Sequence, residues 1–222
     1  MVGTKLAVFD LDGTLIDSRR DLADSANEVL AAYGAPPLDE ERIVSMVGSG
    51  APTLVKRVLT AAGVDAPVDE ALTRFLAAYD GRLTKHTRPY DGIPGLLDEL
   101  QKRRTAMALL TNKPLEQSVR ILDAFGLSKY FQWVVGGDGP WPRKPAPDGI
   151  RYLMREAAAG PGETLLIGDS TIDLQTSRNA GVRICLARYG FGFADLAETD
   201  LRGDESIVDI PAEITGVLDA PQ

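Results

Sequence analysis

The chain has 222 residues and a hydrophobic content of 44%, which is enough for one large or two modest domains with a real core. Its net charge of -8 argues against nucleic acid or an anionic membrane surface as the main partner, because either would need a basic face. A single cysteine excludes an internal disulfide, and the N-terminal stretch reads as neither a signal peptide nor a membrane span, so we expect a cytoplasmic protein.

Six short apolar runs predict strands, and segments with helical periodicity separate most of them. In chain order the runs are Lys5–Phe9, Ala106–Leu110, Trp133–Val135, Leu165–Ile167, Val182–Ala187 and Ile207–Ile210. Alternation of this kind is typical of an α/β fold with a doubly wound parallel sheet. The runs are continuously apolar, as strands are when helices cover both faces of a sheet. Cys185 lies inside the fifth run, where we expect a buried and unreactive thiol.

The interval between the first two runs is far longer than the roughly twelve residues that a crossover between parallel strands requires. It carries three apolar stripes at helical spacing, from Leu22 to Tyr33, from Val55 to Ala62 and from Leu72 to Leu83. Such stripes usually face the core of a helical bundle. We therefore predict an inserted helical cap over residues 17–87, with residues 1–16 and 88–222 forming the core.

Two aspartates one residue apart, Asp10 and Asp12, follow the first predicted strand and precede Gly13 and Thr14. An isolated Asp-Gly pair is typical of a solvated turn. The longer string Asp-x-Asp-Gly-Thr is a rare coincidence at average residue usage. The pair therefore predicts a chemical role at the end of this strand.

Three more polar loops follow predicted strands, and they contain Thr111 with Asn112, Lys144, and Asp169. Ligands of open parallel sheets bind at the carboxyl ends of the strands, so we expect these loops to converge with Asp10 on one crevice. Each loop alone has a simpler explanation. Thr111 could only cap the following helix, and Lys144 could be an ordinary surface lysine.

Two Ser-x-x-Asp pairs have the spacing of a helix capping box. For the first pair, Ser18 and Asp21, we predict helix capping. The second pair, Ser170 and Asp173, also fits a helix end, and it lies beside Asp169. We therefore predict a supporting role for Asp173.

The converging residues suit phosphoryl transfer. Asp10, Asp12 and Asp169 offer hard oxygen ligands with no histidine or cysteine among them, which favours Mg²⁺ over zinc. The Thr111 hydroxyl, nearby backbone N–H groups and the Lys144 ammonium can bind phosphoryl oxygens, and positioning with charge neutralisation is most of what this reaction requires. A carboxylate can also be the nucleophile and form an aspartyl-phosphate, and Asp10 is our candidate.

Four strings of the chain resemble the ordered motifs of the haloacid dehalogenase superfamily: Asp10-Leu-Asp-Gly-Thr-Leu, Thr111-Asn112, Lys144-Pro145 and Gly168-Asp169-Ser170-Thr-Ile-Asp173. The resemblance covers essentially the whole chain, and it implies a Rossmann-like core with a helical cap, Mg²⁺ dependence and phosphomonoester hydrolysis. It assigns Asp10 as nucleophile and Asp12 as general acid and then general base. It also implies that Thr111, Asn112 and Lys144 bind phosphate or substrate. The implied metal ligands are Asp10, the carbonyl group of Asp12 and Asp169.

Further strings resemble the phosphoglycolate phosphatase branch of that superfamily: Asp17-Ser18-x-x-Asp21-Leu22, Val47-Gly48-Ser49-Gly50, Thr111-Asn112-Lys113-Pro114 and Tyr189-Gly190-Phe191-Gly192. This resemblance implies a small acidic phosphomonoester as substrate and partner, with 2-phosphoglycolate first in line. Amino-sugar phosphates, pyridoxal phosphate, nucleotides and pyrophosphate stay open, as does the oligomeric state. In the cap, the backbone of Gly48-Ser49-Gly50 could approach the ligand while Lys56 or Arg57 places a cation near its carboxylate. Alternatively, the glycines form only a turn and the cation faces water.

Related enzymes with other activities are expected to differ from this chain at single positions. A sugar-phosphate mutase of similar fold tends to carry a histidine in the first cap helix, where this chain has Leu22. A dehalogenase would lack the acid at Asp12, and a phosphonate-cleaving relative would need a cap lysine such as Lys56, which on a helix flank usually faces water. A non-catalytic phosphate-binding module is disfavoured because every expected catalytic residue is present.

Overall fold

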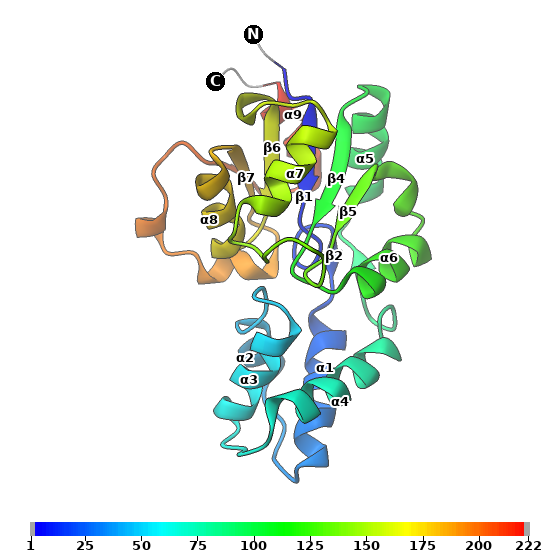
Figure 1. The fold of residues 1–222 in the computed structure, drawn as a ribbon, viewed down its shortest axis with the longest axis vertical. Coiled ribbons are helices and arrows are strands. Elements are labelled where there is room, and N and C mark those ends of the chain that lie inside the picture. The colour runs from blue at the N-terminus through cyan, green and yellow to red at the C-terminus, as the bar shows by residue number, and fades with distance from the viewer. Residues whose placement is uncertain (1–2, 220–222) are drawn as a thin grey trace.

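The structure, a computed structural model, describes residues 3–219. Its centre is a sheet of six parallel strands in the order β5-β4-β1-β6-β7-β8 (Figure 1). The strands are β1 Leu6–Phe9, β4 Ala106–Leu110, β5 Trp133–Val135, β6 Thr164–Gly168, β7 Arg183–Ala187 and β8 Ser206–Val208. Each coincides with one of the predicted apolar runs, with shifts of one or two residues at some ends. The predicted doubly wound α/β fold is confirmed.

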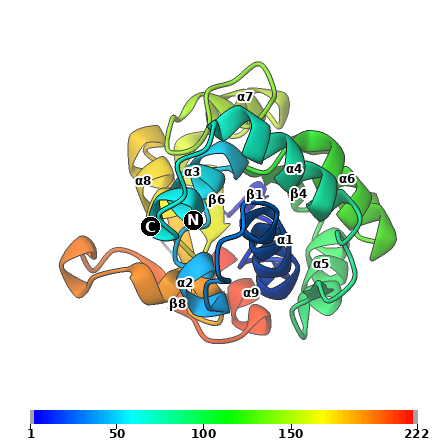
Figure 2. The ribbon, with the colours of Figure 1, turned by 90° about the horizontal axis from the view of Figure 1, so that it is seen from below.

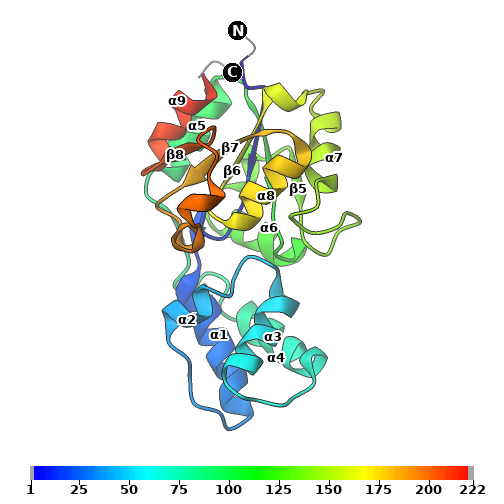
Figure 3. The same ribbon diagram turned by 90° about the vertical axis from the view of Figure 1, so that its left-hand side faces the viewer.

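Helices cover both faces of the sheet, which explains why the strands carry continuous apolar runs. The helices are α5 Ile93–Lys102, α6 Leu115–Ala124, α7 Asp148–Glu156, α8 Thr171–Ala180 and α9 Ile214–Leu218. Residues of α5, α6 and α9 pack with one set of strand side chains, and residues of α7 and α8 pack with the other set. Figure 3 shows α5 and α9 on one side of the sheet and α7 on the other. Short 3-10 helices complete this part: η1 Ser128–Tyr130, η2 Pro161–Glu163, η3 Phe191–Asp195, η4 Glu198–Asp200 and η5 Pro211–Glu213.

Four helices lie together below the carboxyl ends of the strands (Figures 1 and 2). They are α1 Arg19–Ala32, α2 Glu40–Val44, α3 Ala51–Ala61 and α4 Val68–Asp80. The three predicted stripes lie on α1, α3 and α4, but the last residue of each, Tyr33, Ala62 and Leu83, lies beyond the end of its helix. The short α2 gave no periodic signal. Within residues 3–219, no helix combines the length and apolarity that a membrane crossing requires. The division of the chain at 17 and 88 stays a prediction.

Two very short antiparallel strands connect the four helices to the sheet. β2 Ile16–Asp17 and β3 Arg88–Pro89 pair where the chain leaves the core and where it returns. The pairing was not predicted, because a two-residue strand carries no periodic pattern. The pairing of β2 with β3 holds the two connections between the core and the four helices side by side.

The predicted capping role of Ser18 and Asp21 is wrong. Ser18 makes no side-chain cap bond to α1 and instead donates from Oγ to Asp12 Oδ1 at 2.6 Å. Asp21 is fully buried, and its carboxylate accepts bonds from the backbone N–H groups of His86 and Thr87 and from the Thr87 hydroxyl. The reason is tertiary: the returning chain presents three donors to the Asp21 carboxylate, the two backbone N–H groups and the Thr87 hydroxyl. Asp21 therefore ties the two connections together.

The strand order reverses between β1 and β6, because the chain builds outward from β1 to β5 on one side and then returns to β6 on the other. A crevice forms at such a switch point, outside the carboxyl ends of the strands. Asp10 follows β1 and Asp169 follows β6. The fold thus brings two of the predicted site residues to the position where ligands bind.

Cys185 is fully buried in β7, and we expect its thiol to be unreactive in the folded protein. Burial raises the pKa of Cys185 to about 12. At pH 8 only about one thiol in ten thousand would then be ionised, and the thiolate is the reactive form. Ellman's reagent should detect no thiol in the native protein and one per chain in denaturant. Rapid labelling without denaturant would show that β7 opens locally.

Candidate active site

Asp10 begins the loop after β1, and its backbone N–H donates to the Ile167 carbonyl of β6 at 2.9 Å. Its side chain faces Lys144, whose Nζ lies 2.9 Å from Asp10 Oδ1. Lys144 comes from the long loop between β5 and α7 and is only 5% exposed, so it is not a surface lysine. The candidate nucleophile thus meets a buried cation.

Asp169 and Asp173 complete an acidic cluster next to this pair. One carboxylate oxygen from each of Asp10, Asp169 and Asp173 lies within 4.8 Å of the others. Asp169 follows β6 and accepts bonds from the Gly192 backbone N–H at 2.7 Å and the Thr14 hydroxyl at 3.2 Å.

Asp173 combines the predicted capping role with a second contact. It forms the capping box of α8 with Ser170, and its Oδ1 lies 2.6 Å from Lys144 Nζ. Asp173 is therefore a second carboxylate that holds the Lys144 ammonium in place beside Asp10.

The charges of the cluster are not balanced. Burial raises the pKa of Asp10 to about 6, although Lys144 opposes the shift, and the charge of Asp173 adds to it. Burial, together with the charges of Asp173 and Asp10, also raises the pKa of Asp169 well above its ordinary range. Burial disfavours the charged form of Lys144, but its two aspartate partners outweigh burial and raise its pKa. One ammonium thus faces three carboxylates.

This donor set fits a hard divalent cation. Asp10 and Asp169 offer carboxylate oxygens, no histidine or cysteine of residues 3–219 joins their cluster, and a divalent charge would offset the excess of carboxylates. The Asp12 side chain is not part of the cluster because it points toward Lys113. Its carbonyl oxygen is the atom that the resemblance implies as ligand, and that role stays a prediction.

Thr111 and Asn112 follow β4 and are both buried. Thr111 is not the cap of the next helix, because α6 begins after Pro114, and its hydroxyl instead accepts from the Lys113 backbone N–H at 3.2 Å. Asn112 Nδ2 donates to the carbonyl groups of Gly48 and Lys144, each at 2.9 Å. Asn112 therefore links the cap loop to the core loop that carries Lys144.

Asp12 is held by two side chains that sequence reasoning did not assign to it. Lys113 Nζ lies 2.9 Å from both carboxylate oxygens, and Ser18 donates to one of them. Tyr79 of α4 accepts a bond of 2.6 Å from the same ammonium. Lys113 is part of the string Thr111-Asn112-Lys113-Pro114, so the sequence already pointed to its position. Tyr79 belongs to an apolar stripe, and nothing in the sequence pairs it with Lys113.

The predicted cap loop approaches the core closely. Gly48 and Gly50 have positive φ values of 112° and 88°, and a Cβ on Gly50 would lie 3.2 Å from the Asn112 carbonyl oxygen. The glycines therefore allow contact with the core loop as well as a turn. Ser49 and Arg57 line a cavity with Asp10, while Arg57 itself is exposed and donates from Nη1 to the Met46 carbonyl at 3.0 Å.

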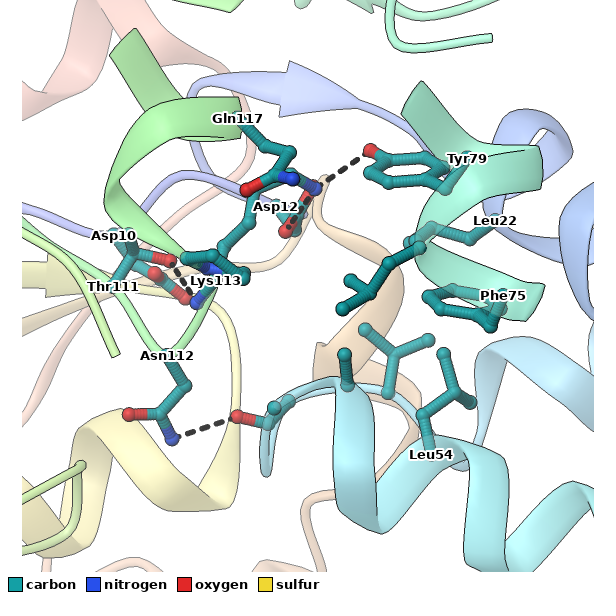
Figure 4. A pocket seen from close by; sticks show the side chains of 16 residues that line it. Asp10, Asp12, Leu22, Leu54, Phe75, Tyr79, Thr111, Asn112, Lys113 and Gln117 are labelled. Atoms are coloured by element: carbon teal, nitrogen blue, oxygen red, sulfur yellow. Dashed lines mark hydrogen bonds and ion pairs between the residues drawn. The ribbon is translucent and has the colours of Figure 1, made fainter. Parts of the chain in front are cut away.

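Two cavities meet at Asp10 and Asp12. The smaller has a volume of about 50 Å³ and runs toward α4, between Lys113 and apolar cap residues such as Leu54 and Phe75 (Figure 4). The larger, about 320 Å³, passes Asp169 and opens beside the loop that contains Ser49. The structure thus brings the predicted site residues together. The carboxylates of Asp10 and Asp169 lie beside the Lys144 ammonium, where the two cavities meet.

The sequence matches a known family over most of its length. Residues 7–187 match the family model of the haloacid dehalogenase-like hydrolases. The chain is 40% identical over 192 residues to a phosphoglycolate phosphatase of Pseudomonas syringae pv. syringae, an alignment that covers 84% of this chain and 70% of that protein. It is 33% identical over 220 residues to a plasmid-encoded phosphoglycolate phosphatase of Cupriavidus necator, covering 96% of this chain and 94% of the relative.

Solved structures share the whole fold. A crystal structure named as a predicted phosphoglycolate phosphatase, from Haemophilus somnus 129PT, has a TM-score of 0.91 at 28% identity. The alignment covers 96% of this chain and 97% of that one. The complex of CbbY from Rhodobacter sphaeroides with phosphate is similar in fold, with a TM-score of 0.82 at 23% identity and coverage of 98% and 100%.

Proposed function

This chain belongs to the haloacid dehalogenase-like hydrolase family, and on that premise we propose that it is a Mg²⁺-dependent phosphatase for 2-phosphoglycolate. The observation that carries the proposal is the contact of Asp10 with Lys144 beside Asp169, at the switch point of the sheet. A carboxylate nucleophile, a phosphate-binding cation and a metal-binding carboxylate are the groups that phosphoryl transfer requires.

In the first half of the reaction, an Asp10 carboxylate oxygen attacks the phosphorus. The bond between phosphorus and the bridging oxygen breaks, and Asp12 gives its proton to that oxygen. In the second half, Asp12 takes a proton from water, the water oxygen attacks the aspartyl-phosphate, and Asp10 is released with inorganic phosphate. Lys144 and Thr111 bind the phosphoryl oxygens during both halves. A single carboxyl group, Asp12, thus serves as acid and then as base.

Mg²⁺ would be held by the carboxylates of Asp10 and Asp169 and by the Asp12 carbonyl. When bound, it supplies positive charge that neutralises the phosphoryl group and the crowded carboxylates. Asp173 does not join this set in our proposal, because it holds Lys144 and caps α8. Its part is to keep the phosphate-binding ammonium fixed.

The size of the smaller cavity supports a small leaving group. A space of about 50 Å³ beside Asp12 suits a leaving group as small as glycolate. The names of the Pseudomonas and Cupriavidus relatives agree with this choice of substrate. Leu22 lines the same cavity, so a mutase-type histidine is absent at that point.

A phosphate-release screen over several dozen phosphomonoesters, with Mg²⁺ and with EDTA, tests the proposal. We expect the highest kcat/KM for 2-phosphoglycolate and loss of turnover in EDTA. A sugar phosphate or nucleotide preferred by more than about tenfold, which is about 1.4 kcal/mol of discrimination, would overturn the substrate. Equal turnover in EDTA would overturn the metal requirement.

A further inference from the structure

Lys113 is a buried cation with no role in the reaction described above. Its side chain is 4% exposed, and its Nζ lies 2.9 Å from each carboxylate oxygen of Asp12. The ammonium also donates to the Tyr79 hydroxyl at 2.6 Å and lies 4.5 Å from the centre of the Tyr79 ring. In Figure 4 the three side chains point toward one another, where α4 of the cap meets the loop after β4.

Among the lysines and arginines of residues 3–219, only Lys113 and Lys144 are buried. Lys144 lies between Asp10 and Asp173, where the phosphoryl group binds. Lys113 instead lies against Asp12, the group that must reach the leaving oxygen. Lys113 is therefore the buried positive charge on the leaving-group side of the site.

Arg57 is the alternative cation for an acidic substrate, but its position is less suited. It is exposed, its guanidinium is bonded to the Met46 carbonyl, and it lines the larger cavity, which opens past Asp169. Water screens an exposed charge, so its attraction for a carboxylate is weak. Apolar side chains of the cap, including Leu54 and Phe75, line the cavity beside Lys113, and a pair formed there is screened much less.

The dimensions of a two-carbon acid fit this contact. In 2-phosphoglycolate the carboxylate carbon is two bonds from the bridging oxygen, a distance of about 2.5 Å. That oxygen must come within about 3 Å of Asp12 for proton transfer. A carboxylate so placed is within reach of an ammonium that already touches both oxygens of Asp12.

We propose that Lys113, oriented by Tyr79, binds the carboxylate of the substrate and determines the specificity for acidic leaving groups. The proposal rests on the phosphatase function proposed above, and it names the residue that distinguishes 2-phosphoglycolate from an uncharged ester of the same size. Tyr79 acts through Lys113 and is a positioning residue.

Binding of non-hydrolysable analogues tests the proposal without catalysis. 3-Phosphonopropionate replaces the bridging oxygen of 2-phosphoglycolate by a methylene group, and propylphosphonate lacks its carboxylate. Calorimetry with Mg²⁺ present measures the dissociation constants. Lys113→Met should weaken the binding of 3-phosphonopropionate by about 30-fold or more, the usual cost of removing one partner of a buried charge pair. The dissociation constant of propylphosphonate should change by less than about threefold in the same variant. Lys113→Arg should keep part of the preference, and exposed Lys102→Met is the matched control.

Kinetics separate specificity from a general effect on Asp12. The ratio of kcat/KM for 2-phosphoglycolate to that for 2-hydroxyethyl phosphate should fall toward one in Lys113→Met. Tyr79→Phe should lower the ratio less. Circular dichroism and thermal unfolding of each variant show whether it is folded.

Several outcomes would overturn the assignment. Equal weakening of both analogues by Lys113→Met would reduce Lys113 to a structural or Asp12-positioning role. Loss of discrimination in Arg57→Met, with Lys113→Met unaffected, would assign carboxylate recognition to Arg57. Failure of the phosphatase proposal looks different: wild-type protein would release no phosphate from any ester, p-nitrophenyl phosphate included.

Discussion

Asp10→Asn should lower kcat for 2-phosphoglycolate by about 10⁴-fold or more, in the range found when a catalytic nucleophile is removed. The amide has nearly the shape of the carboxylate, so it fits the same space beside Lys144. It is, however, a very poor nucleophile, and no aspartyl-phosphate can form. Phosphate release at saturating substrate, with purified and homogeneous protein, measures the loss.

Two controls make that result specific. Asp65→Asn is the same substitution at an exposed cap position and should leave kcat unchanged. Intact-protein mass spectrometry excludes deamidation of the introduced amide back to aspartate, which would restore activity in a fraction of the molecules. If a homogeneous and folded Asp10→Asn protein turned over like the wild type, Asp10 would not be the nucleophile.

Asp12→Asn should slow both halves of the reaction, and the loss should depend on the leaving group. An alkoxide leaving group needs a proton, so phosphorylation by 2-phosphoglycolate should slow by about 10² to 10⁴-fold. p-Nitrophenolate leaves readily without a proton. The rate of phosphorylation by p-nitrophenyl phosphate should therefore fall by about tenfold or less. Single-turnover phosphorylation with the two substrates measures this difference.

Ser18→Ala is a useful companion to that experiment. It removes one hydrogen bond to Asp12 and leaves both contacts with Lys113. Its effect should have the same dependence on leaving group and be much smaller. Equal losses for the alkyl and the aryl ester in Asp12→Asn would contradict the role of Asp12 as acid.

Much of the fold could be predicted because its signals are local. Each buried strand is a continuous apolar run, and the loops that follow β1, β4, β5 and β6 carry the polar residues. Once a parallel sheet is inferred, topology alone brings those loops to one edge. Asp10, Asp169 and Lys144 could therefore be grouped before any distance was known.

The contacts that depend on tertiary packing could not be predicted. Ser18 and Asp21 have capping-box spacing, yet they bond to Asp12 and to the returning chain at Thr87. Tyr79 lies in an apolar stripe that reads as core, and its hydroxyl still meets Lys113 across the cap and the core. A periodic pattern identifies the buried face of a helix but not the residue that faces it from another element.

Trapping the phosphorylated enzyme tests the central claim most directly. Wild-type protein is mixed with 2-phosphoglycolate and Mg²⁺, quenched with acid within one turnover, and reduced with borohydride, which converts an aspartyl-phosphate to homoserine. Peptide mass spectrometry should find homoserine at position 10 and nowhere else. Substrate consumption in that same turnover without modification of Asp10, or with modification at another carboxylate, would contradict the account.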